Sequence, residues 1–195
     1  MGIAEVIFSL LFLVAGIVLE IYSFESLRES RQFTRLATTK IDTILPGQVR
    51  LKGTVHPATD VLLKAPYSLK ECVYYGFEKA VKKESDSGTH WSAVDGGRQF
   101  RDFRIDDGSG QALVRLSEAV DLSLWQQFHK VEGGLRYTES RIDPGDEVTV
   151  IGIAEASEEG IAISFATAGD SLSLITHYDG STKSLWWAHL SVLMS

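Results

Sequence analysis

The sequence contains little cysteine and few prolines: its 195 residues include one cysteine and four prolines. The single cysteine, Cys72, cannot form a disulfide within the chain and cannot supply the paired thiolates of a structural zinc site. The five histidines lack the short spacing of metal ligands. The Gly-x-Ser-x-Gly, His-Glu-x-x-His, phosphate-loop and dinucleotide motifs are also missing. We therefore expect no catalytic residues, no metal and no cofactor.

Lysine and arginine together are fewer than aspartate and glutamate. The chain has 19 lysines and arginines against 26 acidic residues, a net charge of −7. Because an acidic protein repels phosphate backbones, we expect no nucleic acid partner. The 44% apolar content is that of a folded chain.

Long hydrophobic runs are scarce, and the clearest spans residues 3–24, with Glu5 and Glu20 near its two ends. A membrane span needs about 20 mostly apolar residues, and acidic residues at its ends can lie at headgroup depth. A basic start and a small-residue cleavage site, which a signal peptide needs, are missing. We therefore predict a transmembrane helix over residues 1–24; a buried globular helix is the alternative.

Basic residues follow this segment and do not precede it. They are Arg28, Arg31, Arg35 and Lys40. The positive-inside rule then predicts a single-pass membrane protein whose main domain faces the cytoplasm. The three arginines share one face of a predicted helical linker, residues 25–40. They could contact anionic lipid headgroups, but a solvated face paired with nearby glutamates is the interpretation we favour.

Alternating apolar and polar residues predict β-strands through most of the domain at 41–170. The predicted strands lie within 45–55, 72–83, 100–116, 143–156 and 160–165. The third of these segments contains Asp-Asp-Gly-Ser-Gly and predicts a hairpin, because glycine supplies the positive φ of a tight turn.

Two segments do not alternate. Residues 84–99 are polar and glycine-bearing and predict a long mobile loop. Leu122, Trp125 and Phe128 recur at helical spacing and predict a short helix within 117–130. The order of elements predicts a mainly β fold: a small, OB-like, partly open antiparallel barrel with one short helix.

Two aromatic features remain. Trp91 and its neighbour His90 are candidate contacts for a partner or for lipid, and the alternative is that the indole folds back over the barrel. The tail, residues 171–195, is a linker that ends in an apolar stretch at 185–194. This stretch is too short to span a bilayer. It could begin a second membrane helix or form an interfacial or barrel-packing segment.

Four stretches follow in order: PGQVRLKGTV, KECVYY, DDGSG and DPGDEV. With them, residues 34–170 resemble the GIDE or BAM domain of membrane proteins, which occurs in mitochondrial RING-type E3 ubiquitin ligases and in prokaryotic membrane proteins. The residues that carry the resemblance are Pro46, Gly47, Cys72, Tyr74, Tyr75, Asp107, Gly108, Gly110, Pro144 and Gly145.

The resemblance implies a module that lies against a membrane between two transmembrane helices. A RING finger needs about eight zinc ligands in paired spacings, and this sequence does not contain them. The chain is therefore more similar to the prokaryotic form, and we favour a protein without enzymatic activity. We expect a non-catalytic interaction or sensing module whose partners are membrane lipids and an unknown membrane or cytoplasmic protein. The alternative is a subunit or remnant of a RING-type ligase whose catalytic part is absent.

Cys72 itself is open to two interpretations. In an uninterrupted strand it would face the same side as Tyr74 and opposite Tyr75. No histidine near it in sequence could activate the thiol. We favour a packed small hydrophobic residue over a reactive thiol.

Overall fold

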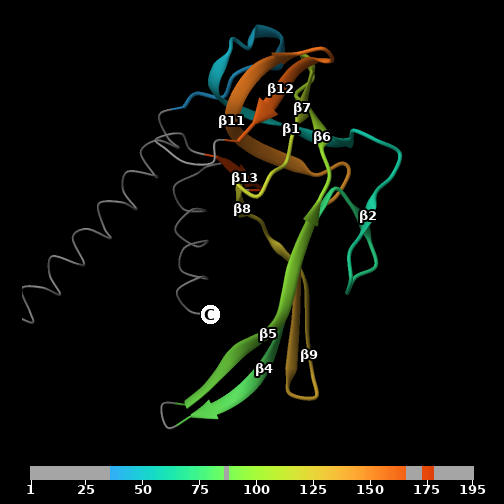
Figure 1. Cartoon of the computed structure of the whole chain (residues 1–195), viewed down its shortest axis with the longest axis vertical. Coiled ribbons are helices and arrows are strands. Elements are labelled where there is room, and N and C mark those ends of the chain that lie inside the picture. Colours follow the sequence, from blue (N-terminus) through green and yellow to red (C-terminus); the bar gives the residue numbers. More distant parts are fainter. Residues whose placement is uncertain (1–35, 86–87, 166–172, 178–195) are drawn as a thin grey trace, which may run out of the picture. The chain divides into compact units, whose positions relative to one another are not determined.

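The computed structural model describes residues 36–85, 88–165 and 173–177, and in them most of the chain is β-strand, joined by turns and loops, with almost no helix (Figure 1). This confirms the prediction of a mainly β fold. The predicted transmembrane helix, the three arginines of the linker and the apolar tail lie outside the described residues. Within the described ranges, we find no helix with the length and hydrophobicity that a bilayer crossing requires.

Five strands form a barrel, as predicted. They are β1 (Gly47–Pro57), β6 (Phe103–Asp106), β7 (Gln111–Val114), β11 (Glu147–Ser157) and β12 (Gly160–Ser164). Their order around the barrel is β1-β6-β7-β12-β11, and β11 pairs again with β1. The β7–β12 pairing is parallel and the other four are antiparallel.

The barrel is closed, which corrects the prediction of a partly open one. β1 and β11 each have 11 residues, so each is long enough to curl and pair with neighbours on both sides. The switch lies at Thr54, which pairs with both Glu147 and Asp106. A Cβ atom at the preceding Gly53 would lie 2.4 Å from the Asp106 carbonyl oxygen. Glycine therefore permits the close approach of β1 and β6 that closes the barrel.

Alternate residues of the barrel strands point inward and form the core. Val49, Leu51 and Val55 are buried on one face of β1, as predicted. They pack with inward side chains from the other barrel strands, including Phe103, Ile105, Val114, Val148, Val150 and Ile163. This burial on one face explains why the alternation was legible in the sequence.

A second sheet has the order β5-β4-β10-β9, and we call it the arm. Its strands are β4 (Tyr74–Ser85), β5 (Gly88–Phe100), β9 (Gln126–Glu132) and β10 (Leu135–Ile142). The β4–β5 hairpin is inserted between β1 and β6, and the β9–β10 hairpin between β7 and β11. At about 3.3 Å per residue, β4 is about 40 Å long. Figure 1 shows β4, β5 and β9 running away from the barrel strands.

The remaining elements are short. They are η1, a 3-10 helix (Ile41–Thr43), β2 (Leu63–Lys64), β3 (Glu71–Cys72), β8 (Asp121–Ser123) and β13 (Leu174–Thr176). β2 and β3 form a small hairpin before the arm. β13 pairs antiparallel with β11 and parallel with β8, so it extends the barrel sheet.

Two predictions of secondary structure were wrong. The expected loop at 84–99 is mostly the strand β5, paired with β4 along its length. The expected helix at 117–130 is replaced by β8 and β9, because β13 and β10 supply hydrogen-bonding partners to this segment. The helical spacing of apolar residues was misleading: Leu122 packs against the barrel core, whereas Trp125 is 52% exposed between the two strands.

Candidate functional site

The predicted contact residues Trp91 and His90 lie on β5 and not on a loop. The Arg136 guanidinium lies 5.3 Å from the centroid of the half-buried Trp91 ring and pairs with Glu78 at 3.1 Å. Trp91 therefore packs on the arm, and not on the barrel as the alternative prediction had it. His90 is exposed and lies opposite Lys83 on β4.

Most of the residues that carry the resemblance to the GIDE or BAM domain are framework residues of the barrel. Pro46 directly precedes β1 and Gly47 is its first residue, while Pro144 and Gly145 form the turn before β11. Both glycines have positive φ, as do glycines in other turns of the barrel.

Asp107 fixes the β6–β7 turn to the segment before β1. Its carboxylate accepts hydrogen bonds from the Ile41 N–H at 3.1 Å and from the Ser109 N–H at 2.8 Å. Burial alone would raise the pKa of Asp107, but these hydrogen bonds and the Ser109 hydroxyl lower it to about 2. Gly108, with φ of 81°, and Gly110 complete the turn. Asp107, Gly108 and Gly110 therefore have a structural role in this turn.

Cys72 is fully buried and packs with Ala65 and Tyr75 in a small cluster, while Tyr74 belongs to the barrel core. The prediction that Cys72 and Tyr74 share a side was wrong, because the strand is interrupted at Val73 between β3 and β4. Burial raises the pKa of the Cys72 thiol to about 12, so it stays protonated. The geometry supports the interpretation of a packed residue.

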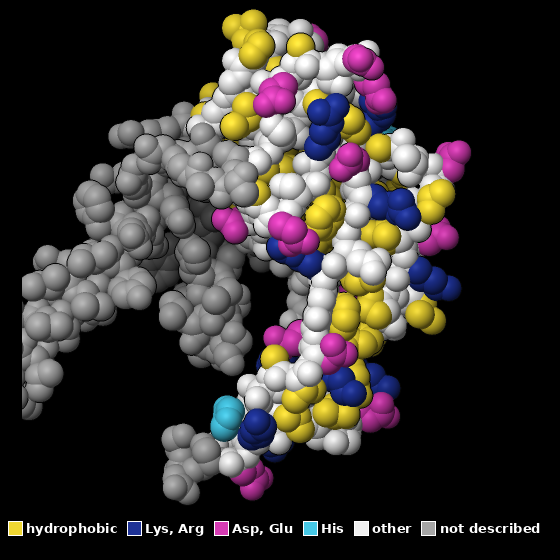
Figure 2. Space-filling model, in the orientation of Figure 1, with side chains coloured by type: hydrophobic (Ala, Val, Ile, Leu, Met, Phe, Trp, Pro, Cys, Tyr) yellow, Lys and Arg dark blue, Asp and Glu magenta, His cyan; other side chains and the backbone are white. Residues whose placement is uncertain are grey.

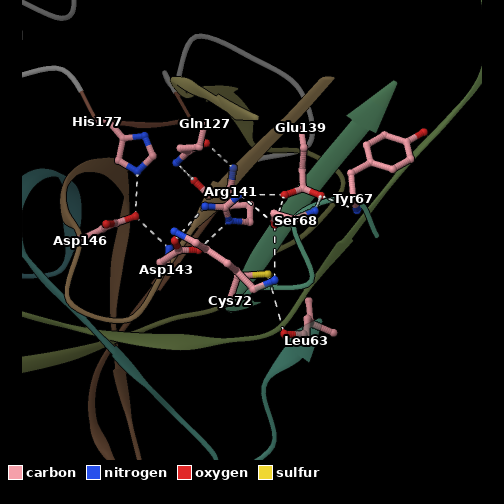
Figure 3. A network of polar contacts seen from close by, with 11 residues as sticks. Leu63, Tyr67, Ser68, Cys72, Gln127, Glu139, Arg141, Asp143, Asp146 and His177 are labelled. Carbon is pink, nitrogen blue, oxygen red and sulfur yellow. Dashed lines mark hydrogen bonds and ion pairs between the residues drawn. The ribbon is translucent and has the colours of Figure 1, made fainter. Parts of the chain in front are cut away.

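A network of polar side chains that was not predicted from the sequence lies at the base of the arm (Figure 3). Its centre is the buried pair Glu139 and Arg141 on β10, with Asp143 just beyond the strand. The sequence could have indicated this network, because the three charged residues stand at alternate positions, and alternate residues of a strand point to the same side. We call Glu139, Arg141, Asp143 and Ser68 the polar cluster.

Glu139 accepts hydrogen bonds from the segment between β2 and β3. The donors are the Tyr67 N–H at 2.9 Å, the Ser68 N–H at 3.3 Å and the Ser68 hydroxyl at 2.5 Å. Arg141 adds an ion pair at 2.7 Å. Burial alone would raise the pKa of Glu139, but the hydrogen bonds from Ser68, Arg141 and Tyr67 lower it. Glu139 is therefore a carboxylate in the fold.

Arg141 joins three parts of the cluster. Its Nη1 also donates to the Ser68 hydroxyl at 3.0 Å, and its Nε and Nη2 donate to the two oxygens of Asp143 at 3.0 and 3.2 Å. The Gln127 side-chain amide pairs with the Arg141 backbone in both directions at 2.8 Å. These contacts occupy the guanidinium and the Glu139 carboxylate and leave both buried. The polar cluster is suited to holding the β2–β3 hairpin to β10, not to acid–base catalysis.

His177 forms a second buried contact at the end of β13. Its Nε2 lies 3.2 Å from Asp146 Oδ2, and its Nδ1 accepts the Trp125 N–H at 3.4 Å. Because Nδ1 is an acceptor, the neutral ring carries its proton on Nε2 and donates it to Asp146. The Asp146 carboxylate in turn accepts the Asp143 N–H at 2.8 Å. His177 thus joins β13 to the turn before β11 and to the segment that leads into β9.

His177 is expected to make the stability of the fold depend on pH. Burial lowers the pKa of His177, and the nearby Asp146 only partly opposes this effect. The unfolded chain therefore binds a proton, at the ordinary pKa of about 6.5, that the folded chain excludes. Stability contributed by neutral His177 is present above that pH and declines below it, by on the order of 1 kcal/mol between pH 7.5 and 5.5. Urea unfolding of the parent chain and His177→Asn at both pH values measures the difference.

The exposed His129 supplies the control for this measurement. The variant His129→Asn should keep the parent's dependence on pH, whereas His177→Asn should flatten it. An equal slope for the parent and His177→Asn would contradict the assignment.

The arm carries a cluster of aromatic rings on one face. Tyr67 packs edge-on against Phe77 at 5.5 Å and Tyr137 at 5.3 Å, and it lies 6.0 Å from Phe128. The Lys79 ammonium lies 5.7 Å from the Tyr137 ring. Figure 2 shows hydrophobic side chains gathered along the arm between charged ones. This half-exposed face, unlike the polar cluster, is accessible to a partner.

The surface of the described residues has two open grooves. One, of about 310 Å³, lies between the arm and the β8–β9 segment, with Gly76, Thr138 and Ser140 among its lining residues. The other, of about 700 Å³, lies beside β1, and its lining lysines Lys40 and Lys52 are paired with Asp107 and Glu147. Among the described residues, no group of three or more His, Cys, Asp or Glu side chains could hold a metal ion.

Comparison with models of known protein families, with curated proteins and with solved structures found no match to this chain.

Proposed function

We propose that this chain is a non-catalytic interaction module that works beside a membrane, and that the arm is its contact surface. The observation that carries the proposal is the contrast between two sets of side chains. The charged pair at the centre of the polar cluster, Glu139 and Arg141, is buried and occupied by hydrogen bonds within the cluster. The arm instead holds half-exposed aromatic rings and 13 mostly exposed residues of β5. Such a surface favours binding over catalysis.

The barrel topology supports the OB-like assignment. In chain order the barrel strands are β1, β6, β7, β11 and β12, and the one parallel pairing joins the third, β7, to the fifth, β12. OB-like barrels often bind single-stranded nucleic acid through a basic groove. The net charge of −7 does not favour that ligand. A barrel of this kind is thus the scaffold, and the arm supplies the contacts.

The membrane part of the proposal rests on the sequence. The apolar segment at 3–24, the basic residues after it and the resemblance to the GIDE or BAM domain all support a chain anchored in a bilayer. The partners that we propose are lipids and a membrane or cytoplasmic protein.

Site-specific photo-crosslinking in native membranes tests the arm as the contact surface. A benzoylphenylalanine is placed at Val94 on β5, at Val131 on β9, and at Val61 outside the arm as a control. All three valines are more than half exposed. We expect at least one arm position to give a reproducible crosslinked protein, identified by mass spectrometry, that Val61 does not give. Crosslinks of equal yield from all three positions, or none from the arm, would count against the proposal.

A further inference from the structure

The arm has two edge strands, β5 and β9, because the sheet order is β5-β4-β10-β9. In the described part of the chain, no strand pairs with the outer side of either one. Alternate residues of an edge strand direct their N–H and C=O groups away from the sheet. An edge of this kind can pair with a strand from another molecule unless the sequence protects it.

The two edges are protected to different degrees. The segment Thr89–Val94 of β5, which we call the β5 edge, contains neither a charged residue nor a proline. The β9 edge carries Lys130 and Glu132, paired with each other at 2.6 Å. Charged side chains are a common protection of edge strands. The β5 edge is therefore the one that remains able to accept another strand.

Two lysines lie directly behind the β5 edge. Lys82 pairs in register with Trp91 and Lys83 with His90, so the lysines point to opposite faces of the sheet. Both are exposed, and in the described residues neither forms an ion pair. Glu84 is the single acidic neighbour on this part of β4. A strand added at the β5 edge would meet positive charge on both faces, which favours acidic side chains at successive positions.

The sequence at the end of the β4–β5 hairpin does not suit insertion into a bilayer. Residues 84–89 read ESDSGT, with two acidic residues and no apolar one. Interfacial anchors place aromatic and aliphatic side chains at the lipid. Here Trp91 lies along the side of the hairpin against Arg136. The arrangement favours a partner that lies alongside β5.

We propose that the β5 edge binds an extended, acidic segment of a partner protein as a fifth strand of the arm. Backbone hydrogen bonds to the β5 edge provide the register, and Lys82 and Lys83 select the charge. This inference rests on the proposed function, because it assigns the partner's chemistry to the contact surface described above.

Fluorescence anisotropy of the purified chain with labelled peptides tests the proposal. The first probe is a ten-residue peptide in which pairs of glutamates alternate with pairs of threonines, so that acidic side chains lie on both faces of the added strand. The second keeps the same glutamates but has proline in place of each threonine, so its charge is equal and its strand pairing is blocked. Two further probes are a vesicle containing anionic phospholipid and an oligothymidine. We expect binding of the first peptide and at least tenfold weaker binding of each of the others.

Two matched valine variants locate the site. Val94 on β5 and Val131 on β9 are 56% and 51% exposed, so glutamate should be tolerated in the fold at either position. Val94→Glu places a negative charge on the β5 edge and should weaken binding of the glutamate–threonine peptide about tenfold. This change in Kd corresponds to about 1.4 kcal/mol of binding free energy. Val131→Glu should leave the affinity unchanged. The double variant Lys82→Glu, Lys83→Glu should abolish binding, and circular dichroism verifies that each variant folds.

Several results would overturn strand addition. They are no binding of the glutamate–threonine peptide, equal binding of the proline peptide, tighter binding of vesicles or oligothymidine, and equal loss in the two valine variants. Photo-crosslinking separates this failure from that of the proposed function. A partner captured from Val131 and not from Val94 would keep the arm as the contact surface and reject the β5 edge.

Discussion

Replacing Arg141 with alanine is expected to lower the free energy of unfolding by about 3–5 kcal/mol. The substitution removes the ion pair to Glu139, whose side chain is buried and stays ionised in the fold. It also removes the donors to Asp143 and one donor to Ser68. A buried carboxylate that loses its cation has no access to water, so the cost is that of an uncompensated buried charge and not that of a surface ion pair. Urea unfolding followed by circular dichroism measures it.

Arg104 provides the matched control, because it pairs with the exposed Glu159 at 2.7 Å. Arg104→Ala should change stability by no more than about 1 kcal/mol, since solvent screens an exposed pair. The double variant Glu139→Leu, Arg141→Met removes both charges together and should recover much of the loss. If Arg141→Ala were as mild as Arg104→Ala, the polar cluster would not be what holds the β2–β3 hairpin to β10.

The barrel strands could be predicted from the sequence because one side of each is buried and the other is not. Val49, Leu51 and Val55 alternate with polar residues for that reason. The Asp-Asp-Gly-Ser-Gly turn was legible because Gly108 adopts a positive φ. These are local properties, which a sequence displays directly.

The arm was harder to predict, because much of β5 and β9 is exposed on both faces. Residues without a buried face have no reason to alternate, so β5 read as a loop. The pairing of β4 with β10 joins hairpins that are far apart in the chain, and local patterns do not encode such pairing. The expected helix was wrong for a related reason, since the distant strand β13 supplies the partner of β8 and the following strand β10 supplies that of β9.

The polar cluster shows the limit for sites. Glu139 and Arg141 alternate on one strand, which is a visible signal of a shared face. Their partner Ser68 lies 71 residues before Glu139, and its position between β2 and β3 follows from the fold alone. Sequence reasoning could therefore have identified the charged pair but not the hydroxyl and backbone donors that occupy it.

Truncating Phe103 and truncating Phe128 are expected to affect different parts of the molecule. Phe103 is fully buried in the barrel core, so Phe103→Ala should lower the free energy of global unfolding by about 3–5 kcal/mol. Phe128 is half-buried on the arm and contacts Tyr67. Phe128→Ala should cost about 1 kcal/mol and act mainly on local opening of the arm. Denaturant unfolding and native-state hydrogen exchange distinguish the two effects.

In the Phe128→Ala variant, amides of β9 and β10 should exchange faster while those of β1 and β11 keep their protection. In Phe103→Ala, protection should fall in the barrel strands and in the arm together, because global unfolding exposes both. Uniform loss of protection in Phe128→Ala would mean that arm and barrel open as one cooperative unit. A separately opening arm suits the proposed binding surface: a sheet that opens at small cost can adjust its edge to an incoming strand while the barrel stays folded.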